Sequence, residues 1–154
     1  MKTVLFVCTG NTCRSPMAKA VMDAQLRAHP RLAGRVQTNS AGLMVAYGGG
    51  GMTQNAQIAL EELGVPFGRH SAKRFTCALA DKADLILTME AWQADEVAAL
   101  CPGARGRTDT LGRYAGTSGD IRDPYGGPLS AYMASAKEIQ EAVAKALARL
   151  EKER

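Results

Sequence analysis

The sequence predicts an α/β protein with three layers, in which helices cover both faces of a parallel sheet. Short apolar segments alternate with helical patterns along the chain, which is typical of βαβ units joined by right-handed crossovers. The chain has 154 residues, enough for one domain to bury a core without disulfides or metals. We therefore expect residues 1–154 to form a single α/β/α domain.

The first strand and the first helix are predicted close to the N-terminus. Residues 4–7 (Val-Leu-Phe-Val) indicate a buried strand. After a turn, Ser15 and Pro16 indicate the start of a helix, because serine is a favoured N-cap and proline fits the first helical position. Apolar residues at helical spacing continue this pattern until Pro30 and Gly34 end it.

The same alternation continues in the middle of the chain. Residues 35–38 predict a second strand, and residues 39–42 (Asn-Ser-Ala-Gly) predict a turn after it. Thr53 is the predicted N-cap of a helix that ends at Gly64. A short third strand is predicted over residues 65–67, so that the region supplies one more strand-helix-strand unit.

The second half of the chain predicts a buried strand between helices. Thr76 can cap a short helix that ends at Lys82, and residues 84–89 then indicate a buried parallel strand. A helix is predicted over residues 90–100 and a long amphipathic helix from Pro128 onward. The apolar face of the long helix carries Leu129, Tyr132, Met133, Ala136, Ile139, Val143, Leu147 and Leu150.

The turn after the first strand has the composition of a phosphate site. Cys8 begins it, and Arg14 follows six residues later in the run Cys-Thr-Gly-Asn-Thr-Cys-Arg-Ser. Loop amides and the N-terminus of the helix can bind an anion, and the Arg14 guanidinium matches two phosphate oxygens. The same field should lower the pKa of the Cys8 thiol, whose thiolate attacks phosphorus. The predicted phosphate-binding residues are Thr9, Gly10, Asn11, Thr12, Cys13 and Arg14.

Other interpretations of this turn fit the sequence less well. An ordinary strand-to-helix loop with a buried cysteine would not require Arg14, Ser15 and Pro16 to follow it together. A G-x-x-x-x-G-K-[ST] nucleotide loop occurs nowhere in the chain, and the turn lacks the Rossmann glycine pattern. Cys8 and Cys13 are separated by four residues, which excludes the C-x-x-C motif of thioredoxins and zinc knuckles.

Together with Asp123-Pro124-Tyr125 downstream, the turn resembles the signature of the low-molecular-weight protein tyrosine phosphatase family. That signature is C-x5-R-S near the N-terminus and an Asp-Pro pair far downstream, and the resemblance extends from residue 2 to about residue 150. It implies a flavodoxin-like fold with four parallel strands. It also implies a cysteine nucleophile at Cys8, phosphate binding by Arg14 and a general acid at Asp123. Taken alone, the Asp123 segment could be an ordinary turn.

The resemblance assigns supporting roles to residues around the nucleophile. The Ser15 hydroxyl would donate to the Cys8 thiolate, in addition to capping the helix. Asn11, Ser40 and His70 would form a hydrogen-bond network that holds the loop, and asparagine suits a left-handed turn position. His70 could equally be a structural or a surface histidine.

All four cysteines (Cys8, Cys13, Cys77 and Cys101) are expected to be thiols, because we expect a reducing compartment. The resemblance implies that Cys13 can pair with Cys8 under oxidation and protect it from irreversible over-oxidation. Cys13 could also be a simple packing residue. Cys77 and Cys101 are interpreted as structural or incidental.

The residue at position 12 bears on the choice of substrate. Tyrosine-directed members of the family commonly have Ile or Leu there, whereas this chain has Thr12 and resembles the protein arginine phosphatase branch. A small polar side chain should penalise phosphotyrosine more than phosphoarginine. Tyr125 departs from the phenylalanine of that branch, and Tyr125 and Tyr47 would wall the pocket. Phosphoarginine in proteins is therefore the first hypothesis and phosphotyrosine the second.

Two further classes are possible. An arsenate reductase uses a related cysteine loop on this fold but usually needs a downstream pair of resolving cysteines, and Cys77 and Cys101 are far apart in the sequence. A non-catalytic phosphate-binding regulator would be expected to lack Cys8 or Asp123. Both residues are present, which favours an enzyme.

Composition limits the partners. The formal charge of +4 is mild and lacks the basic stripe of a nucleic-acid-binding protein. The first residues lack the pattern expected of a signal peptide, and no apolar run approaches about 20 residues, so we expect a cytoplasmic protein without membrane contact. His29 and His70 are too far apart to suggest a metal, and no cofactor is expected. The expected partners are phosphorylated proteins, with inorganic phosphate as product and inhibitor, and the protein is expected to be a monomer.

Overall fold

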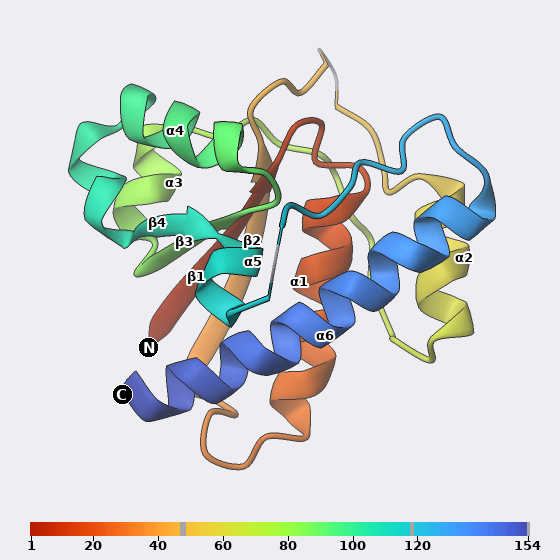
Figure 1. Ribbon diagram of the computed structural model, residues 1–154, viewed down its shortest axis with the longest axis horizontal. Helices are drawn as coiled ribbons and strands as arrows, with labels where there is room; N and C mark the ends of the chain where they lie inside the picture. The colour runs from red at the N-terminus through yellow and green to blue at the C-terminus, as the bar shows by residue number, and fades with distance from the viewer. Residues whose placement is uncertain (47–48, 118, 154) are drawn as a thin grey trace.

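The computed structural model describes residues 1–46, 49–117 and 119–153. Within them, four parallel strands form one sheet in the order β2-β1-β3-β4 (Figure 1). The strands are β1 (Lys2–Cys8), β2 (Val36–Gly42), β3 (Leu85–Thr88) and β4 (Thr108–Thr110). The predicted four-stranded parallel α/β fold is confirmed.

Helices cover both faces of the sheet (Figure 1). They are α1 (Arg14–Arg27), α2 (Gln54–Glu62), α3 (Cys77–Lys82), α4 (Ala91–Leu100), the 3-10 helix η1 (Pro102–Arg107), α5 (Leu111–Ala115) and α6 (Leu129–Glu153). Successive side chains of a strand point to opposite faces. Val4 and Phe6 accordingly lie in a core with α1, α2, α5 and α6, while Leu5 and Val7 lie in a second core with α3 and α4. One core lies on each face of the sheet, between the strands and the helices that cover that face.

One predicted strand boundary and one predicted strand are wrong. The turn expected at residues 39–42 is instead the second half of β2, where Ser40 and Ala41 are buried and paired with β1. Pairing in the sheet has overridden the turn propensity of these residues. Residues 65–67 form a loop, and the fourth strand is the three-residue edge strand β4, which has no apolar run to reveal it.

The start of α1 also differs from the prediction. Cys13 occupies the N-cap position, so Ser15 is the second helical residue and Pro16 the third. The phosphate loop turns directly into the helix, because Met17 N donates to Cys13 O at 3.0 Å. Ser15 is therefore not an N-cap, and its hydroxyl is available for another contact. In contrast, the predicted cap at Thr76 is confirmed by its bond from Leu79 N.

The last helix, α6, packs along α1 and α2 (Figure 1). Most of the predicted apolar face is buried, but Leu129 is exposed and Met133 is only partly covered. Both lie in the first two turns of the helix. Among the described residues, no helix is both long and apolar enough to cross a membrane.

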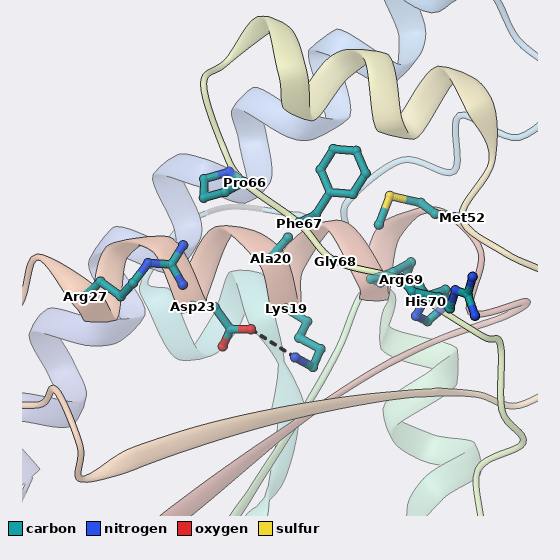
Figure 2. A pocket seen from close by; sticks show the side chains of 11 residues that line it. Lys19, Ala20, Asp23, Arg27, Met52, Pro66, Phe67, Gly68, Arg69 and His70 are labelled. Carbon is teal, nitrogen blue, oxygen red and sulfur yellow. Dashed lines mark hydrogen bonds and ion pairs between the residues drawn. The ribbon is translucent and has the colours of Figure 1, made fainter.

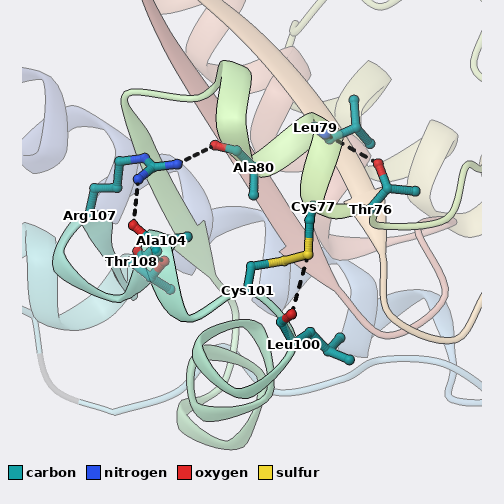
Figure 3. The surroundings of a disulfide bond; sticks show 10 residues. Thr76, Cys77, Leu79, Ala80, Leu100, Cys101, Ala104, Arg107 and Thr108 are labelled. Carbon is teal, nitrogen blue, oxygen red and sulfur yellow. Dashed lines mark hydrogen bonds between the residues drawn. A yellow bond between two sulfur atoms is a disulfide. The ribbon is translucent and has the colours of Figure 1, made fainter.

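Cys77 and Cys101 form a disulfide, which corrects the expectation of four thiols (Figure 3). Their Cα atoms are 5.7 Å apart, within the range that a disulfide requires. They meet because Cys77 starts α3 and Cys101 directly follows the last residue of α4, and both helices pack into the same core. The sequence separation of 24 residues did not indicate this proximity. Cys8 and Cys13 are free thiols, as expected.

Candidate active site

Cys8 is the last residue of β1, at the point where the chain connectivity reverses. β2 follows β1 after the α1 crossover and pairs with one side of it, whereas β3 pairs with the other side of β1. Ligands of open parallel sheets bind beyond the carboxyl ends of the strands at such a point. The fold therefore presents the phosphate loop at the place where a ligand is expected.

The loop after Cys8 is tightly folded around the cysteine sulfur. Asn11 has a left-handed backbone (φ 56°), as predicted, and its amide donates to Cys8 Sγ at 3.3 Å. The end of β2 supports the loop from outside: a Cβ on Gly42 would lie 2.7 Å from Thr9 O and 2.9 Å from Asn11 N. Only glycine allows this close approach, so the sequence of β2 fixes the shape of the loop.

The Cys8 thiol is buried and has a hydroxyl partner. Ser15 Oγ lies 2.9 Å from Cys8 Sγ. Burial raises the pKa of this thiol, and the Ser15 and Asn11 hydrogen bonds and the Arg14 charge lower it by a smaller amount. The loop and Arg14 therefore lower the pKa in the predicted direction, but burial of the sulfur, which the prediction did not consider, outweighs them. The three polar neighbours are what favours the thiolate here.

Asn11 is the centre of a buried hydrogen-bond network. Its side-chain amide donates to Ser15 Oγ at 2.7 Å and to Ser40 Oγ at 3.1 Å. Its side-chain oxygen accepts from Lys73 N at 2.9 Å, and its backbone oxygen lies 2.6 Å from His70 Nε2. The structure thus brings Asn11, Ser15, Ser40 and His70 together, and His70 is not a surface histidine without contacts.

Arg14 is held by groups from two distant segments. Its side chain is almost fully buried, and Nη1 contacts Glu90 Oε2 at 2.6 Å and donates to Ile121 O at 2.8 Å. Nη2 lies 3.5 Å from Asp123 Oδ2. Glu90 was not among the predicted residues, although an acidic residue directly after the strand that neighbours β1 was a usable signal. Its contact fixes the orientation of the guanidinium.

Asp123 lies on the segment that precedes α6, and this segment runs beside the phosphate loop (Figure 1). Its Oδ1 accepts from Tyr125 N at 3.0 Å, which leaves Oδ2 on the side of Arg14. Ser135 of α6 anchors the segment by donating to Arg122 O at 3.0 Å. The acid predicted 115 residues downstream of the nucleophile therefore reaches the same site.

A cavity of about 370 Å³ joins these groups. Predicted residues that line it are Cys8, Thr9, Gly10, Thr12, Cys13, Arg14, Asp123 and Tyr125. Met44, Val45, Ala46 and Ala72 add an apolar wall that was not predicted. Tyr47 lies outside the described residues.

Cys13 lines the same cavity as Cys8. Its sulfur lies 3.4 Å from Thr53 Oγ1 and 3.9 Å from the hydroxyl of Tyr132. Thr53 precedes α2 but makes no capping bond with its side chain. No cluster of three metal-ligating side chains occurs in the part of the chain that the structure describes.

A second cavity, of about 520 Å³, lies along α1 and the 66–70 loop (Figure 2). Its acidic group, Asp23, is paired with Lys19 at 2.9 Å. Of the predicted site residues only His70 reaches it. The nucleophile, the arginine and the acid all belong to the first cavity, which we take as the candidate active site.

The model of the low-molecular-weight phosphotyrosine protein phosphatase family matches residues 3–154. The chain belongs to this family, and it is a cysteine-dependent protein phosphatase and hence a hydrolase. This assignment agrees with the cysteine, arginine and aspartate found in one cavity.

Named relatives include both arginine and tyrosine phosphatases. A protein-arginine-phosphatase of Geobacillus stearothermophilus is 35% identical over 97% of each chain. The low molecular weight protein-tyrosine-phosphatase Ptp of Acinetobacter johnsonii is 36% identical over 80% of each chain. A solved structure of the YwlE arginine phosphatase, a cysteine-to-serine variant with a phosphorylated active-site serine, has a TM-score of 0.89 at 32% identity and covers 99% of this chain and 97% of that chain.

Proposed function

We propose that this phosphatase removes phosphate from phosphoarginine residues of proteins. The observation that carries the proposal is Thr12, which lines the cavity together with Cys8, Arg14 and Asp123. An Ile or Leu at this position would offer an apolar contact to a phenyl ring. Threonine removes that contact and adds a hydroxyl, which favours a polar guanidinium. The similarity to relatives named as arginine phosphatases supports the same choice.

In the first step, Cys8 displaces the substrate from phosphorus. A bond forms between Sγ and phosphorus as the bond from phosphorus to the guanidinium nitrogen breaks, and Asp123 gives its proton to the departing nitrogen. Loop amides and Arg14 bind the three non-bridging oxygens. Glu90 and the Ile121 carbonyl hold Nη1 of Arg14, and the remaining N–H groups of the guanidinium are left for phosphate.

In the second step, water releases the phosphate. The Asp123 carboxylate takes a proton from water, whose oxygen attacks phosphorus as the sulfur-phosphorus bond breaks. The products are inorganic phosphate and the Cys8 thiolate, which the Ser15 hydroxyl and the Asn11 amide stabilise as leaving group. The network around Asn11 keeps the loop in shape through both steps. Because the product occupies the substrate's phosphate site, we also propose that phosphate is a competitive inhibitor.

The test compares phosphoarginine and phosphotyrosine peptides that share their flanking residues. We expect the unmodified protein to have the higher kcat/KM on phosphoarginine. Thr12→Ile should lower the ratio of phosphoarginine to phosphotyrosine kcat/KM by about tenfold or more, and Thr12→Val separates loss of the hydroxyl from added volume. A clear preference of the unmodified protein for phosphotyrosine contradicts the proposal.

Phosphotyrosine is the second candidate substrate. The observation that favours it is Tyr125, an aromatic side chain that is 73% exposed at the cavity and able to stack on a phenyl ring. The relative from Acinetobacter johnsonii is named as a tyrosine phosphatase. The two-step chemistry is the same, with an ester oxygen in place of the guanidinium nitrogen.

The arsenate reductase hypothesis has less support. Cys77 and Cys101 do form a pair, but Cys101 lies in the core under α3 and α4, whereas Cys8 lies in the core on the other face of the sheet. A disulfide relay from Cys8 to this pair would have to pass through the sheet. For Cys13, which lines the cavity beside Cys8, we propose the protective disulfide with Cys8. We also propose that residues 1–154 form one domain and that the protein is a monomer.

A further inference from the structure

We propose that the Thr9 hydroxyl donates a hydrogen bond to the transferring phosphoryl group, and that Gln93 is the positioning residue that directs it. This inference rests on the proposed phosphatase reaction. Thr9 is the first residue of the loop after Cys8 and lines the cavity. Gln93 lies on the first turn of α4, is fully buried, and donates from Nε2 to Thr9 Oγ1 at 3.0 Å.

The orientation of the Gln93 amide follows from its two other partners. Its Oε1 lies 3.0 Å from Met89 N and 2.9 Å from Glu90 N. Both are backbone donors, so only the amide oxygen can face them. The amide nitrogen must then face Thr9, and the side chain cannot be reversed without leaving a buried group unpaired.

This orientation determines where the Thr9 proton can point. Because Gln93 Nε2 donates to Thr9 Oγ1, the hydroxyl proton must point away from Gln93. Among the described residues, no acceptor for this proton is found within hydrogen-bond distance. Since Thr9 faces the cavity with Cys8 and Arg14, a phosphoryl oxygen bound there is the acceptor that completes its hydrogen bonds.

Thr9 and Thr12 would then divide recognition between the two ends of the substrate. Thr12 acts on the leaving group, as argued above, and Thr9 acts on the phosphoryl oxygens. These oxygens carry the negative charge of the transition state, and an oriented donor in a water-poor site stabilises that charge. Gln93 also ties α4 to the phosphate loop. Glu90, the N-cap of the same helix, contacts Arg14, so the start of α4 positions both Arg14 and Thr9.

Gln93→Glu is the sharpest variant, because it reverses the hydrogen bond. One carboxylate oxygen can still accept from Met89 N and Glu90 N, but the other oxygen has no hydrogen to donate to Thr9. Thr9 must then donate its proton to that carboxylate, and it can no longer donate to the phosphoryl group. Thr9→Val removes the hydroxyl at nearly constant shape, and Thr9→Ser restores it.

The chain offers a matched control on the opposite end of the sheet. Gln37 Nε2 donates to Thr3 Oγ1 at 2.8 Å, so Gln37→Glu makes the same chemical change in a second glutamine-threonine pair. Thr3 and Gln37 pair near the starts of β1 and β2, whereas Cys8 ends β1. Gln37→Glu should leave both phosphate affinity and kcat/KM unchanged.

The experiment measures phosphate affinity by calorimetry and kcat/KM on a phosphopeptide. Thr9→Val and Gln93→Glu should each weaken phosphate binding and kcat/KM by about tenfold, and Thr9→Ser should recover most of the loss. In the Thr9→Val background, Gln93→Glu should add less than about a twofold loss. The rate of Cys8 alkylation in each variant corrects for any effect of the new carboxyl on the thiol.

Two results would overturn the inference. One is unchanged phosphate affinity in Thr9→Val, and the other is a full tenfold loss from Gln93→Glu in a protein that already lacks the Thr9 hydroxyl. If Gln93→Glu does not fold, Thr9→Val and Thr9→Ser still decide the role of the hydroxyl. Failure of the proposed function is a separate outcome, because phosphopeptide turnover would then be absent while phosphate affinity still responds to Thr9.

Discussion

The candidate active site combines a buried phosphate loop with an exposed rim. Arg14 is 1% exposed and Asn11 is completely buried, whereas the side chain of Asp123 is 47% exposed and Tyr125 is 73% exposed. Groups that bind phosphate are therefore part of the core, whereas Asp123 and Tyr125, which meet the leaving group, stand on a surface segment; Thr12, a half-buried residue of the loop, faces the same group from the other side. Buried networks are stiff and surface segments open more easily. Phosphate binding is therefore fixed by the fold, and substrate preference is set where Thr12 of the loop faces the rim residues Asp123 and Tyr125 across the cavity.

The largest effect is expected in the loop itself. Cys8→Ser should reduce turnover by about 1,000-fold or more, because a serine hydroxyl at this site is a far weaker nucleophile than a thiolate. Phosphate affinity should persist, since Arg14 and the loop amides remain. Calorimetry with phosphate and a single-turnover assay measure the two properties. Substantial turnover by Cys8→Ser would contradict the nucleophile assignment.

At the rim, Asp123→Asn should affect catalysis and leave phosphate affinity nearly intact. We expect kcat to fall by about 100-fold or more on a phosphopeptide, because the departing group receives no proton. The loss should be much smaller on an aryl phosphate whose leaving group needs no protonation. A loss that is equal on both substrates argues against a general acid at this position.

A smaller effect is expected from Ser15→Ala. The Ser15 hydrogen bond lowers the pKa of the buried Cys8 thiol, so its removal should raise that pKa further. At a fixed neutral pH less thiolate is present, and alkylation of Cys8 by iodoacetamide should slow by about threefold to tenfold.

Mass spectrometry of the Cys8 peptide separates this reaction from alkylation of Cys13. The midpoint of the pH dependence should move to higher pH in Ser15→Ala. Ser40→Ala is the matched control, because Ser40 contacts Asn11 and not the sulfur. Equal rates of Cys8 alkylation in Ser15→Ala and Ser40→Ala would show that the Ser15 hydroxyl has no specific effect on the Cys8 thiol.

The sequence predicted local features of the site better than features that depend on packing. The positions of Cys8 and Arg14, the left-handed Asn11 and the parallel sheet follow from short-range patterns. Glu90 and Gln93 were missed because they contact Arg14 and Thr9, which lie about 80 residues earlier in the sequence. The raised pKa of Cys8 also depends on burial, which the motif does not describe.

Two other differences have the same origin. β4 is a three-residue edge strand, and its membership of the sheet comes from pairing with β3 rather than from its own composition. The Cys77–Cys101 disulfide depends on where α3 and α4 pack. Sequence spacing and an assumed compartment predicted thiols, and only the arrangement of the two helices brings the cysteines together.

The disulfide gives the weakest expected effect on catalysis. Replacing both cysteines (Cys77→Ser with Cys101→Ala) should lower the free energy of unfolding by about 2–4 kcal/mol, because the cross-link restricts the unfolded chain. The kcat/KM should change by about twofold or less, since Glu90 and Gln93 lie at the other end of α4 and keep their own bonds. Denaturant unfolding with and without a reducing agent provides the control: the reductant should destabilise the unmodified protein and leave the variant unaffected. A large loss of activity in the variant would show that packing on the far face of the sheet also shapes the phosphate loop. The buried part of the site would then extend along the whole of α4.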